Sequence, residues 1–341
     1  MIDYQKYRDE FDSSLDEGGE YSIGLNFSRY PSQILFEMDE TAYHEQLTEY
    51  VNQKREDHPQ AIYHYFPAPI AYFYYQTEYG YENENQRLHL LRSTWESLIF
   101  VLYGFILGEV NSKRFSLNGI SVFNGQRIQQ DHNGLMSNKL GWKLEAMQRI
   151  VEYDRQNNKD LIASSHVTTD TFETLKELNH ERNSFSHISA LSPQESLERF
   201  DELYPVVADL LFELDFLENV SLLRYVGNLG DIHKNRFIRF DGHSLQRQNY
   251  DLTFTDSELP YITSILNDEV ILLKFENAIF NISPFIHFYH EGPILKLCYF
   301  KQIERDSGNY VFELIAGTAR EIEINPSQLL HCINTSLGSL L

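Results

Sequence analysis

The sequence has little of several residues and patterns that mark common classes of protein. Its 341 residues include only two cysteines, Cys298 and Cys332, which excludes a disulfide-stapled secreted scaffold and agrees with a reducing compartment. The longest uncharged apolar stretch, residues 97–108, is shorter than the roughly 20 residues that a membrane-spanning helix requires. The first residues do not resemble a signal peptide. We therefore expect a cytoplasmic protein with no membrane association.

Sequence motifs for cofactors are also lacking. There is no Gly-x4-Gly-Lys-Ser/Thr loop, no Gly-x-Gly-x-x-Gly fingerprint and no Gly-x-Ser-x-Gly elbow, so ATP use, dinucleotide use and serine-hydrolase chemistry are unsupported. His287, His290 and Cys298 do not follow a regular zinc-ligand spacing. We predict neither a metal nor a cofactor.

Positive charge is scarce. Lysine and arginine number 28 against 50 acidic residues, and the resulting net charge of −22 repels nucleic-acid phosphates. Residues 111–143 are an exception, because they contain five cations and one acid. The rings of Phe115, Phe123 and Trp142 in this segment are able to stack on unpaired bases, although such rings more commonly pack under a long loop. The candidate RNA-contacting cations of this segment are Lys113, Arg114, Arg127, Lys139 and Lys143.

Hydrophobic periodicity indicates a helical region in the first two thirds of the chain. Residues 1–60 form an acidic segment that we expect to be solvated or partly ordered, and a Tyr- and Phe-rich link follows at residues 63–75. Apolar residues then recur at a 3.6-residue period over residues 88–105, and further helices are predicted at about 143–153 and from Phe172. Another helix starts at Ser192, where Pro193 and Glu195 complete an N-terminal capping signal. Together they predict a bundle of four or more helices.

After about Val226 the sequence pattern changes from helical periodicity to short β-rich runs bounded by turn residues. Strands are predicted at 236–240, 269–275, 294–300 and 310–315, with a hairpin turn at 306–309. The predicted fold class is α+β and multidomain. We expect an acidic N-terminal segment (1–60), a helical bundle (61–226) and a β-rich, mostly antiparallel recognition or partner-binding domain (227–341).

A short motif in the helical region carries the chemistry. Residues 182–187 read Arg-Asn-Ser-Phe-Ser-His, at the end of the helix that we expect Asp170 to cap. Cleaving RNA through its own 2′-hydroxyl requires proton acceptance, proton donation and a cation for the phosphorane. His187 is suited to acid or base catalysis, Arg182 to binding phosphate oxygens, and Asn183 to orienting either partner.

The spacing of the motif constrains how it acts. Asn183 and His187 share one helix face, whereas Arg182 and His187 lie roughly 140° apart around an ideal helix. The two side chains therefore converge only through a distorted last turn, the reach of the arginine, or two copies of the helix meeting at an interface. Glu96 stands where the long helix changes from polar to apolar. It is a possible partner for Arg182, but a surface position is the more common one for a glutamate.

A second Arg-x4-His run serves as an internal comparison. Arg127 and His132 have the same spacing as Arg182 and His187, but they lie in a Gly- and Asn-rich stretch without helical periodicity. Only the run from Arg182 to His187 has an Asn at its second position and a helical setting. We therefore interpret the Arg127–His132 spacing as a coincidence.

The motif in its helical setting resembles that of the HEPN (higher eukaryotes and prokaryotes nucleotide-binding) family, over about half of the chain. The resemblance implies a homodimer in which two motifs form one metal-independent ribonuclease site that leaves 2′,3′-cyclic phosphate ends. It implies that Arg182 stabilises phosphate, Asn183 orients and His187 is the acid or base. Ser189 stands where family toxins silenced by nucleotidylation carry Tyr, which weakens any expectation of that control.

Two hypotheses follow. The first is an endoribonuclease that acts as a toxin or anti-phage immune effector and is restrained by a regulatory protein, an activating ligand or the acidic N-terminal segment. The second is a non-catalytic HEPN-like scaffold that binds a protein partner or a nucleotide. The motif favours the first, and the high acidity favours the second.

Overall fold

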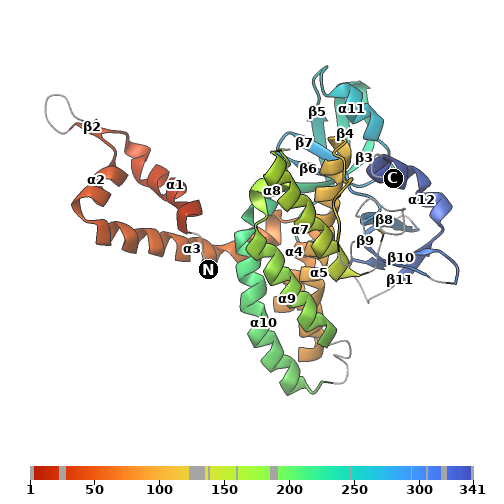
Figure 1. Cartoon of the computed structure of the whole chain (residues 1–341), viewed down its shortest axis with the longest axis horizontal. Helices are drawn as coiled ribbons and strands as arrows, with labels where there is room; N and C mark the ends of the chain where they lie inside the picture. Colours follow the sequence, from red (N-terminus) through yellow and green to blue (C-terminus); the bar gives the residue numbers. More distant parts are fainter. Residues whose placement is uncertain are drawn as a thin grey trace. The chain divides into compact units, whose positions relative to one another are not determined.

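The computed structural model describes residues 4–22, 28–122, 135–136, 139–158, 160–184, 191–245, 247–292, 294–304, 306–315 and 321–338. The chain divides into two compact units, Met1–Ala61 and Ile62–Leu341. Helix α3 (Glu40–Tyr65) runs through the boundary between them (Figure 1).

The first unit is helical and has a small core of its own. Its other elements are α1 (Tyr4–Leu15), η1 (Asp16–Gly18), β1 (Tyr21–Ser22), β2 (Ser28–Arg29) and α2 (Pro31–Met38). Tyr7 and Phe11 of α1 are buried with Tyr43, Leu47 and Val51 of α3. The expectation of a solvated or partly ordered segment is therefore wrong for its described residues. Aromatic side chains supply the buried surface that long aliphatic runs supply elsewhere.

Polar bonds reinforce this small core. The Tyr43 hydroxyl donates to Asp12 Oδ1 at 2.7 Å, and Arg8 Nε donates to the same hydroxyl at 3.2 Å. Lys54 Nζ lies 3.1 Å from Glu10 Oε2. Two of the segment's acidic residues, Glu10 and Asp12, thus hold α1 against α3.

The second unit begins with helices. They are α4 (Ala68–Tyr79), α5 (Glu84–Ser112), α7 (Leu140–Asn157), α8 (Ile162–His166), α9 (Thr169–Ser184) and α10 (Pro193–Glu213), and Figure 1 shows them lying side by side. The predicted capping of α10 is confirmed, since Ser192 Oγ accepts from the Glu195 amide and Glu195 Oε2 accepts from the Ser192 amide. The Tyr- and Phe-rich link is largely helical, because most of it belongs to α4.

Two antiparallel sheets follow, after the short helix η4 (Asp215–Asn219). The first has the order β5-β4-β3-β6-β7 and the second the order β11-β10-β9-β8. Their strands are β3 (Val220–Asp231), β4 (Lys234–Phe240), β5 (Gln248–Thr253), β6 (Leu272–Phe275), β7 (Ala278–Asn281), β8 (Ile286–Glu291), β9 (Ile294–Ile303), β10 (Tyr310–Leu314) and β11 (Glu321–Ile324). Helices α11 (Leu259–Ile265) and α12 (Pro326–Leu337) accompany them. The predicted α+β fold with an antiparallel C-terminal part is confirmed.

Helix α5 is the centre of the second unit. It packs against α4, α7, α9 and α10 and also against strands β7, β8 and β9. Among the described residues it is the one helix long and apolar enough to cross a membrane, but most of its apolar window is buried within the protein, as in the core helix of a soluble fold. The helical and β-rich parts share one hydrophobic core around it. The boundary expected near residue 226 falls inside strand β3 and does not divide that core.

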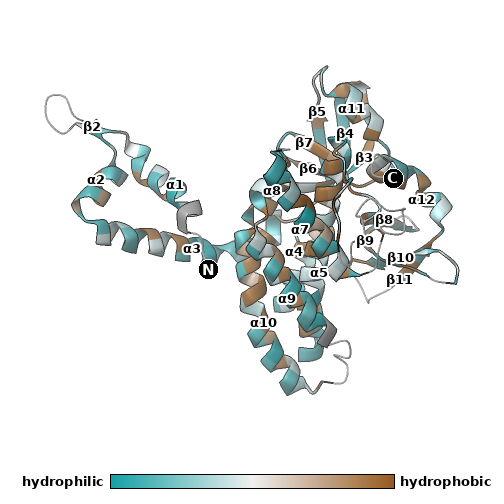
Figure 2. Ribbon diagram, in the orientation of Figure 1, coloured by the Kyte–Doolittle hydropathy of each residue, from teal (hydrophilic) through white to brown (hydrophobic). Residues whose placement is uncertain are grey.

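Figure 2 shows the corresponding distribution of hydropathy. Helix α10 presents alternating brown and teal sides, as expected for a helix with one buried face, whereas α3 is largely teal. Along α10 the buried positions include Phe200, Val207 and Leu211, which face the bundle at helical spacing.

Two glycines allow α5 to approach the first sheet closely. A Cβ added at Gly108 would lie 2.9 Å from Phe280 Cβ and 3.0 Å from the Asn281 carbonyl oxygen. A Cβ at Gly104 would lie 3.1 Å from Ile282 Cβ. Any larger residue at position 108 must push the helix and the strand apart.

We therefore predict that Gly108→Ala destabilises the protein by about 1–3 kcal/mol, the usual effect of overpacking a close contact. Gly141→Ala is the matched control, because that helical position has only an ordinary 3.6 Å neighbour, Asn179 Nδ2. Because alanine favours a helix more than glycine does, Gly141→Ala should raise the free energy of unfolding by roughly 0.5–1 kcal/mol. Urea denaturation of both variants tests this, and equal stabilities would contradict the close packing of α5.

Candidate functional site

Helix α9 carries the arginine of the motif. The Thr171 amide donates to Thr168 Oγ1 at 3.1 Å, so Thr168 caps the helix and the expected cap, Asp170, lies in its first turn instead. Phe172 and Leu175 are buried on the side that faces the bundle. This packing fixes the axis of α9 and so the position of its C-terminal turn.

Arg182 projects from that last turn toward α5. Its Nε lies 2.5 Å from Oε1 of Glu96, so the two residues pair and Glu96 is not the surface residue that the sequence favoured. The Glu96 side chain is 10% exposed, whereas that of Arg182 is 37% exposed. The carboxylate thus holds the guanidinium at the bundle, and the arginine side chain stays partly exposed.

Glu96 faces a second arginine, which sequence analysis missed. Arg92 Nε lies 3.5 Å from the same Glu96 oxygen, one helical turn away on α5. His89 follows one turn further on, and burial together with the Arg92 guanidinium lowers the pKa of its imidazole against an opposing effect of Glu96. The signal was available: residues 89, 92 and 96 are polar positions of one face on a helix that is otherwise mostly apolar.

The β-rich part reaches the same region. Tyr299 of β9 contacts the Phe100 ring at 5.2 Å between centroids. Burial, with Glu313 and Glu96 nearby, raises the pKa of the Tyr299 hydroxyl well above its ordinary range. The polar cluster on α5 is therefore enclosed by α9 on one side and by the second sheet on another.

The remaining motif residues are described only in part. Asn183 belongs to the last turn of α9, next to Arg182, and its side chain is outside the described part of the chain. His187 falls within residues 185–190, which are likewise outside it. The assignment of both therefore rests on the sequence.

Lys143 is not an RNA-contacting residue. It is fully buried on α7, with Nζ 4.4 Å from the centroid of the Tyr103 ring and 5.5 Å from that of Phe285. The amine has no hydrogen-bond partner among the described residues, and burial lowers its pKa to about 7. The prediction was wrong because counting charges does not reveal which helix face a lysine occupies.

The structure supports only some of the other RNA contacts predicted for residues 111–143. The rings of Phe115 and Trp142 are buried, so they are not available for base stacking. Lys113 is exposed but pairs with the buried Glu109, its Nζ lying 2.9 Å from Oε1. Arg114 and Lys139 are exposed, and Arg127 lies outside the described residues, as does Phe123. The basic surface is thus smaller than the sequence implied.

Two other polar features do not form a metal centre. His287 and Cys298 are opposite each other on β8 and β9 and both are buried, which lowers the pKa of the imidazole to about 4 and raises that of the thiol. Within the described parts of the chain, no group of three or more His, Cys, Asp or Glu side chains is arranged to hold a metal ion.

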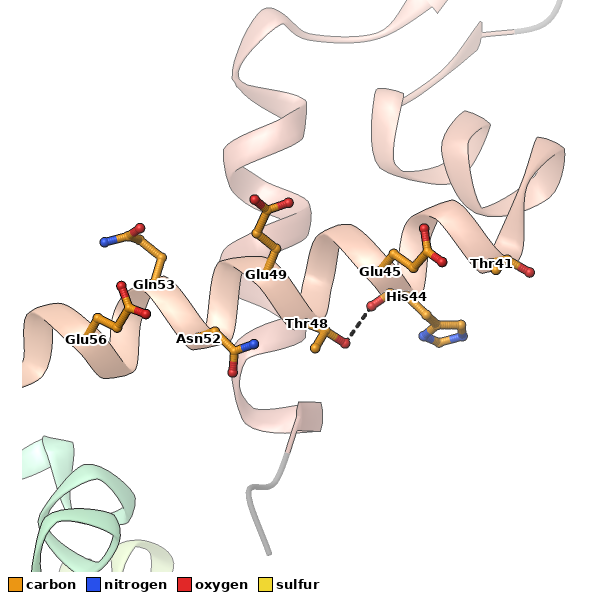
Figure 3. Close-up of a pocket in the computed structure, with 8 residues that line it drawn as sticks. All are labelled: Thr41, His44, Glu45, Thr48, Glu49, Asn52, Gln53 and Glu56. Atoms are coloured by element: carbon orange, nitrogen blue, oxygen red, sulfur yellow. Dashed lines mark hydrogen bonds between the residues drawn. The ribbon is translucent and has the colours of Figure 1, made fainter. Parts of the chain in front are cut away.

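A polar depression runs along α3 in the first unit. Figure 3 shows its eight lining residues, all from that one helix, and Thr48 Oγ1 donates to the His44 carbonyl at 2.7 Å. They are Thr41, His44, Glu45, Thr48, Glu49, Asn52, Gln53 and Glu56. Because every lining residue belongs to one helix, this is an exposed polar helix face rather than an enclosed binding site.

Comparison of the chain with protein-family models, with curated proteins and with solved structures finds no match.

The buried amine of Lys143 makes a specific prediction for stability. In the unfolded chain it titrates near 10.5, and in the folded chain near 7, so the folded state loses stability as the pH falls through that window. We expect Lys143→Met to raise the free energy of unfolding by roughly 1–4 kcal/mol at pH 7, with the gain vanishing toward pH 10.5.

Urea denaturation at several pH values measures this gain. Lys139→Met, at the exposed N-terminal end of the same helix, is the control and should show no such pH-dependent gain. A loss of stability in Lys143→Met at pH 7 would mean that the charged amine stabilises the fold.

Proposed function

We propose that the protein is a metal-independent endoribonuclease of the HEPN type, acting in the cytoplasm as a toxin or anti-phage immune effector. The observation that carries the proposal is the placement of Arg182 at the end of α9, held by Glu96 yet 37% exposed. A guanidinium that is held in place and partly exposed is suited to binding a phosphate oxygen.

In the proposed reaction the 2′-oxygen of a ribose attacks the adjacent phosphorus and the bond from phosphorus to the 5′-oxygen breaks. Arg182 neutralises the charge that develops on the non-bridging oxygens. His187 transfers a proton to or from the reacting oxygens, and Asn183 orients either group. The products are a 2′,3′-cyclic phosphate and a 5′-hydroxyl.

A homodimer is part of the proposal. Because Arg182 and His187 are roughly 140° apart on a regular helix, two copies of the motif at an interface would converge more readily than one. The net charge of −22 adds a second requirement, since it disfavours unassisted RNA binding. RNA binding would then need a regulatory partner or activating ligand that reduces the negative charge of the exposed surface.

The alternative is a non-catalytic scaffold that binds a protein partner or a nucleotide. Two observations favour it: Arg182 already has a carboxylate partner that gives it a structural role, and burial of Lys143 removes one cation from the supposed RNA surface. In a scaffold, replacing His187 would change no RNA chemistry.

The deciding assay is cleavage of total RNA by purified protein in EDTA. We expect the wild type to give fragments with cyclic phosphate ends and His187→Ala to give none. His132→Ala is the matched control, because it removes the histidine of the other Arg-x4-His run and should leave cleavage unchanged. Cleavage that persists in His187→Ala would remove the assignment.

The ion pair makes a separate prediction. Glu96→Gln should lower the cleavage rate roughly 10- to 100-fold, because a displaced guanidinium no longer meets the phosphate in the productive geometry. Glu145→Gln is the control, since Glu145 is equally buried and is paired with Lys176 of the same helix α9 at 2.7 Å.

Both variants should lose similar stability, measured by thermal unfolding, but only Glu96→Gln should lose activity. Equal rates in the two variants would show that Glu96 acts on stability alone.

A further inference from the structure

Helices α9 and α10 leave a groove between them on the surface of the bundle. The two helices contact each other and run alongside one another in Figure 1. The groove has a volume of about 460 Å³, and its apolar lining comes from both helices: Leu178 of α9, and Leu203 and Val206 of α10. Leu178 and Leu203 are buried, whereas Val206 is 37% exposed. The groove therefore has an apolar floor that solvent reaches at Val206.

Polar side chains form the rim of the groove. They are Lys176, Glu177, His180 and Glu181, all from α9. Lys176 is held toward the bundle, because its Nζ lies 2.7 Å from Oε2 of Glu145 on α7. The lysine of the rim is thus paired with a carboxylate of another helix, and the two glutamates make the rim acidic.

Negative charge extends from the rim along both helices. Helices α9 and α10 together contain ten acidic and three basic residues. Each of the three bases pairs with a carboxylate, and the two on α9 pair with residues of α5 and α7. The exposed acidic residues of the two helices include Glu173, Glu177, Glu198, Asp201 and Glu202. The groove is therefore an apolar depression on a strongly acidic helix pair.

The spacing of the acids on α9 favours a cationic partner. Glu173, Glu177 and Glu181 recur every four residues, so each lies beside the next on one face of the helix. Like charges at this spacing destabilise a helix. Cations supplied by another molecule along this face would replace the repulsion with attraction.

We propose that the groove binds a basic amphipathic helix of a partner protein, with its apolar side chains on Leu203 and Val206 and its lysines or arginines beside the acidic residues. An amphipathic helix laid in an apolar groove is a common mode of protein recognition, and complementary charges give it specificity. A second copy of this chain is a poorer occupant, because it would place two acidic helix pairs against each other. The inference does not rest on the proposed function and holds for a nuclease or a scaffold alike.

The first test uses a fluorescein-labelled synthetic peptide of about 18 residues, with leucine on one helical face and lysine on the other. Its binding to the full-length protein is followed by fluorescence anisotropy. We expect saturable binding of one peptide per chain. Val206→Lys should raise the dissociation constant about tenfold, because it removes an apolar contact and adds repulsion. Val226→Lys, the same change at an exposed valine of β3, is the matched control and should leave the constant unaltered.

The second test separates the groove from the overall charge. Glu177→Lys should also weaken binding about tenfold. Glu49→Lys, on the acidic face of α3 that has no apolar lining residue, should not change it. Equal weakening by these two variants would mean that the peptide follows net charge, and this result overturns the inference, as does a wild type that does not bind.

The oligomeric state of the protein tests the other occupant. Analytical ultracentrifugation compares the wild type with Val206→Lys and Val226→Lys, after thermal unfolding has shown that both variants are folded. We expect the two variants to have the same oligomeric state as the wild type. A dimer that Val206→Lys alone dissociates would assign the groove to a second copy of the chain and overturn the inference.

Discussion

The close approach of α5 to the first sheet is the constraint on which the second unit depends. Gly104 and Gly108 bring the helix backbone against Ile282 and Phe280, at distances that are tight for a Cβ at position 104 and too short for one at position 108. Helices on one side and strands on the other consequently bury their apolar faces against the same helix. A separate core for the β-rich part is then unnecessary, which explains why the change in sequence texture near residue 226 does not coincide with a division of the core.

The polar residues of α5 follow from the same arrangement. A helix enclosed on all sides can carry charged groups only where enclosure is incomplete or where the charges are paired. Arg92 and Glu96 stand at the start of the buried stretch, and Glu109 near its end accepts hydrogen bonds from the amides of Ile162 and Ala163. Glu96 in turn ties down Arg182. The position of the motif arginine is therefore set by the central helix as much as by its own.

Periodic elements were predictable from the sequence, and specific pairings were less so. The α10 capping box and the four predicted strands were readable because local side-chain patterns determine them. The first unit was missed because its core is built from scattered tyrosine and phenylalanine residues, which give no aliphatic run. Lys143 was misplaced for a related reason: its aliphatic stem and the surrounding rings make a buried position tolerable, and neither is visible in a charge count. Arg92 was overlooked, although its spacing of four residues from Glu96 places both on one face of α5.

The distribution of charge bears on both hypotheses. Residues 1–61 hold 14 acidic and five basic residues, so less than a fifth of the chain carries about two fifths of the net negative charge. Charges separated by more than a Debye length, about 8 Å at physiological ionic strength, interact weakly. The acidity of the first unit therefore opposes RNA at the second only where the two come close, whereas a partly exposed arginine such as Arg182 acts at contact distance. A strongly acidic protein and a locally cationic phosphate site are compatible for this reason, and net charge alone does not decide between a nuclease and a scaffold.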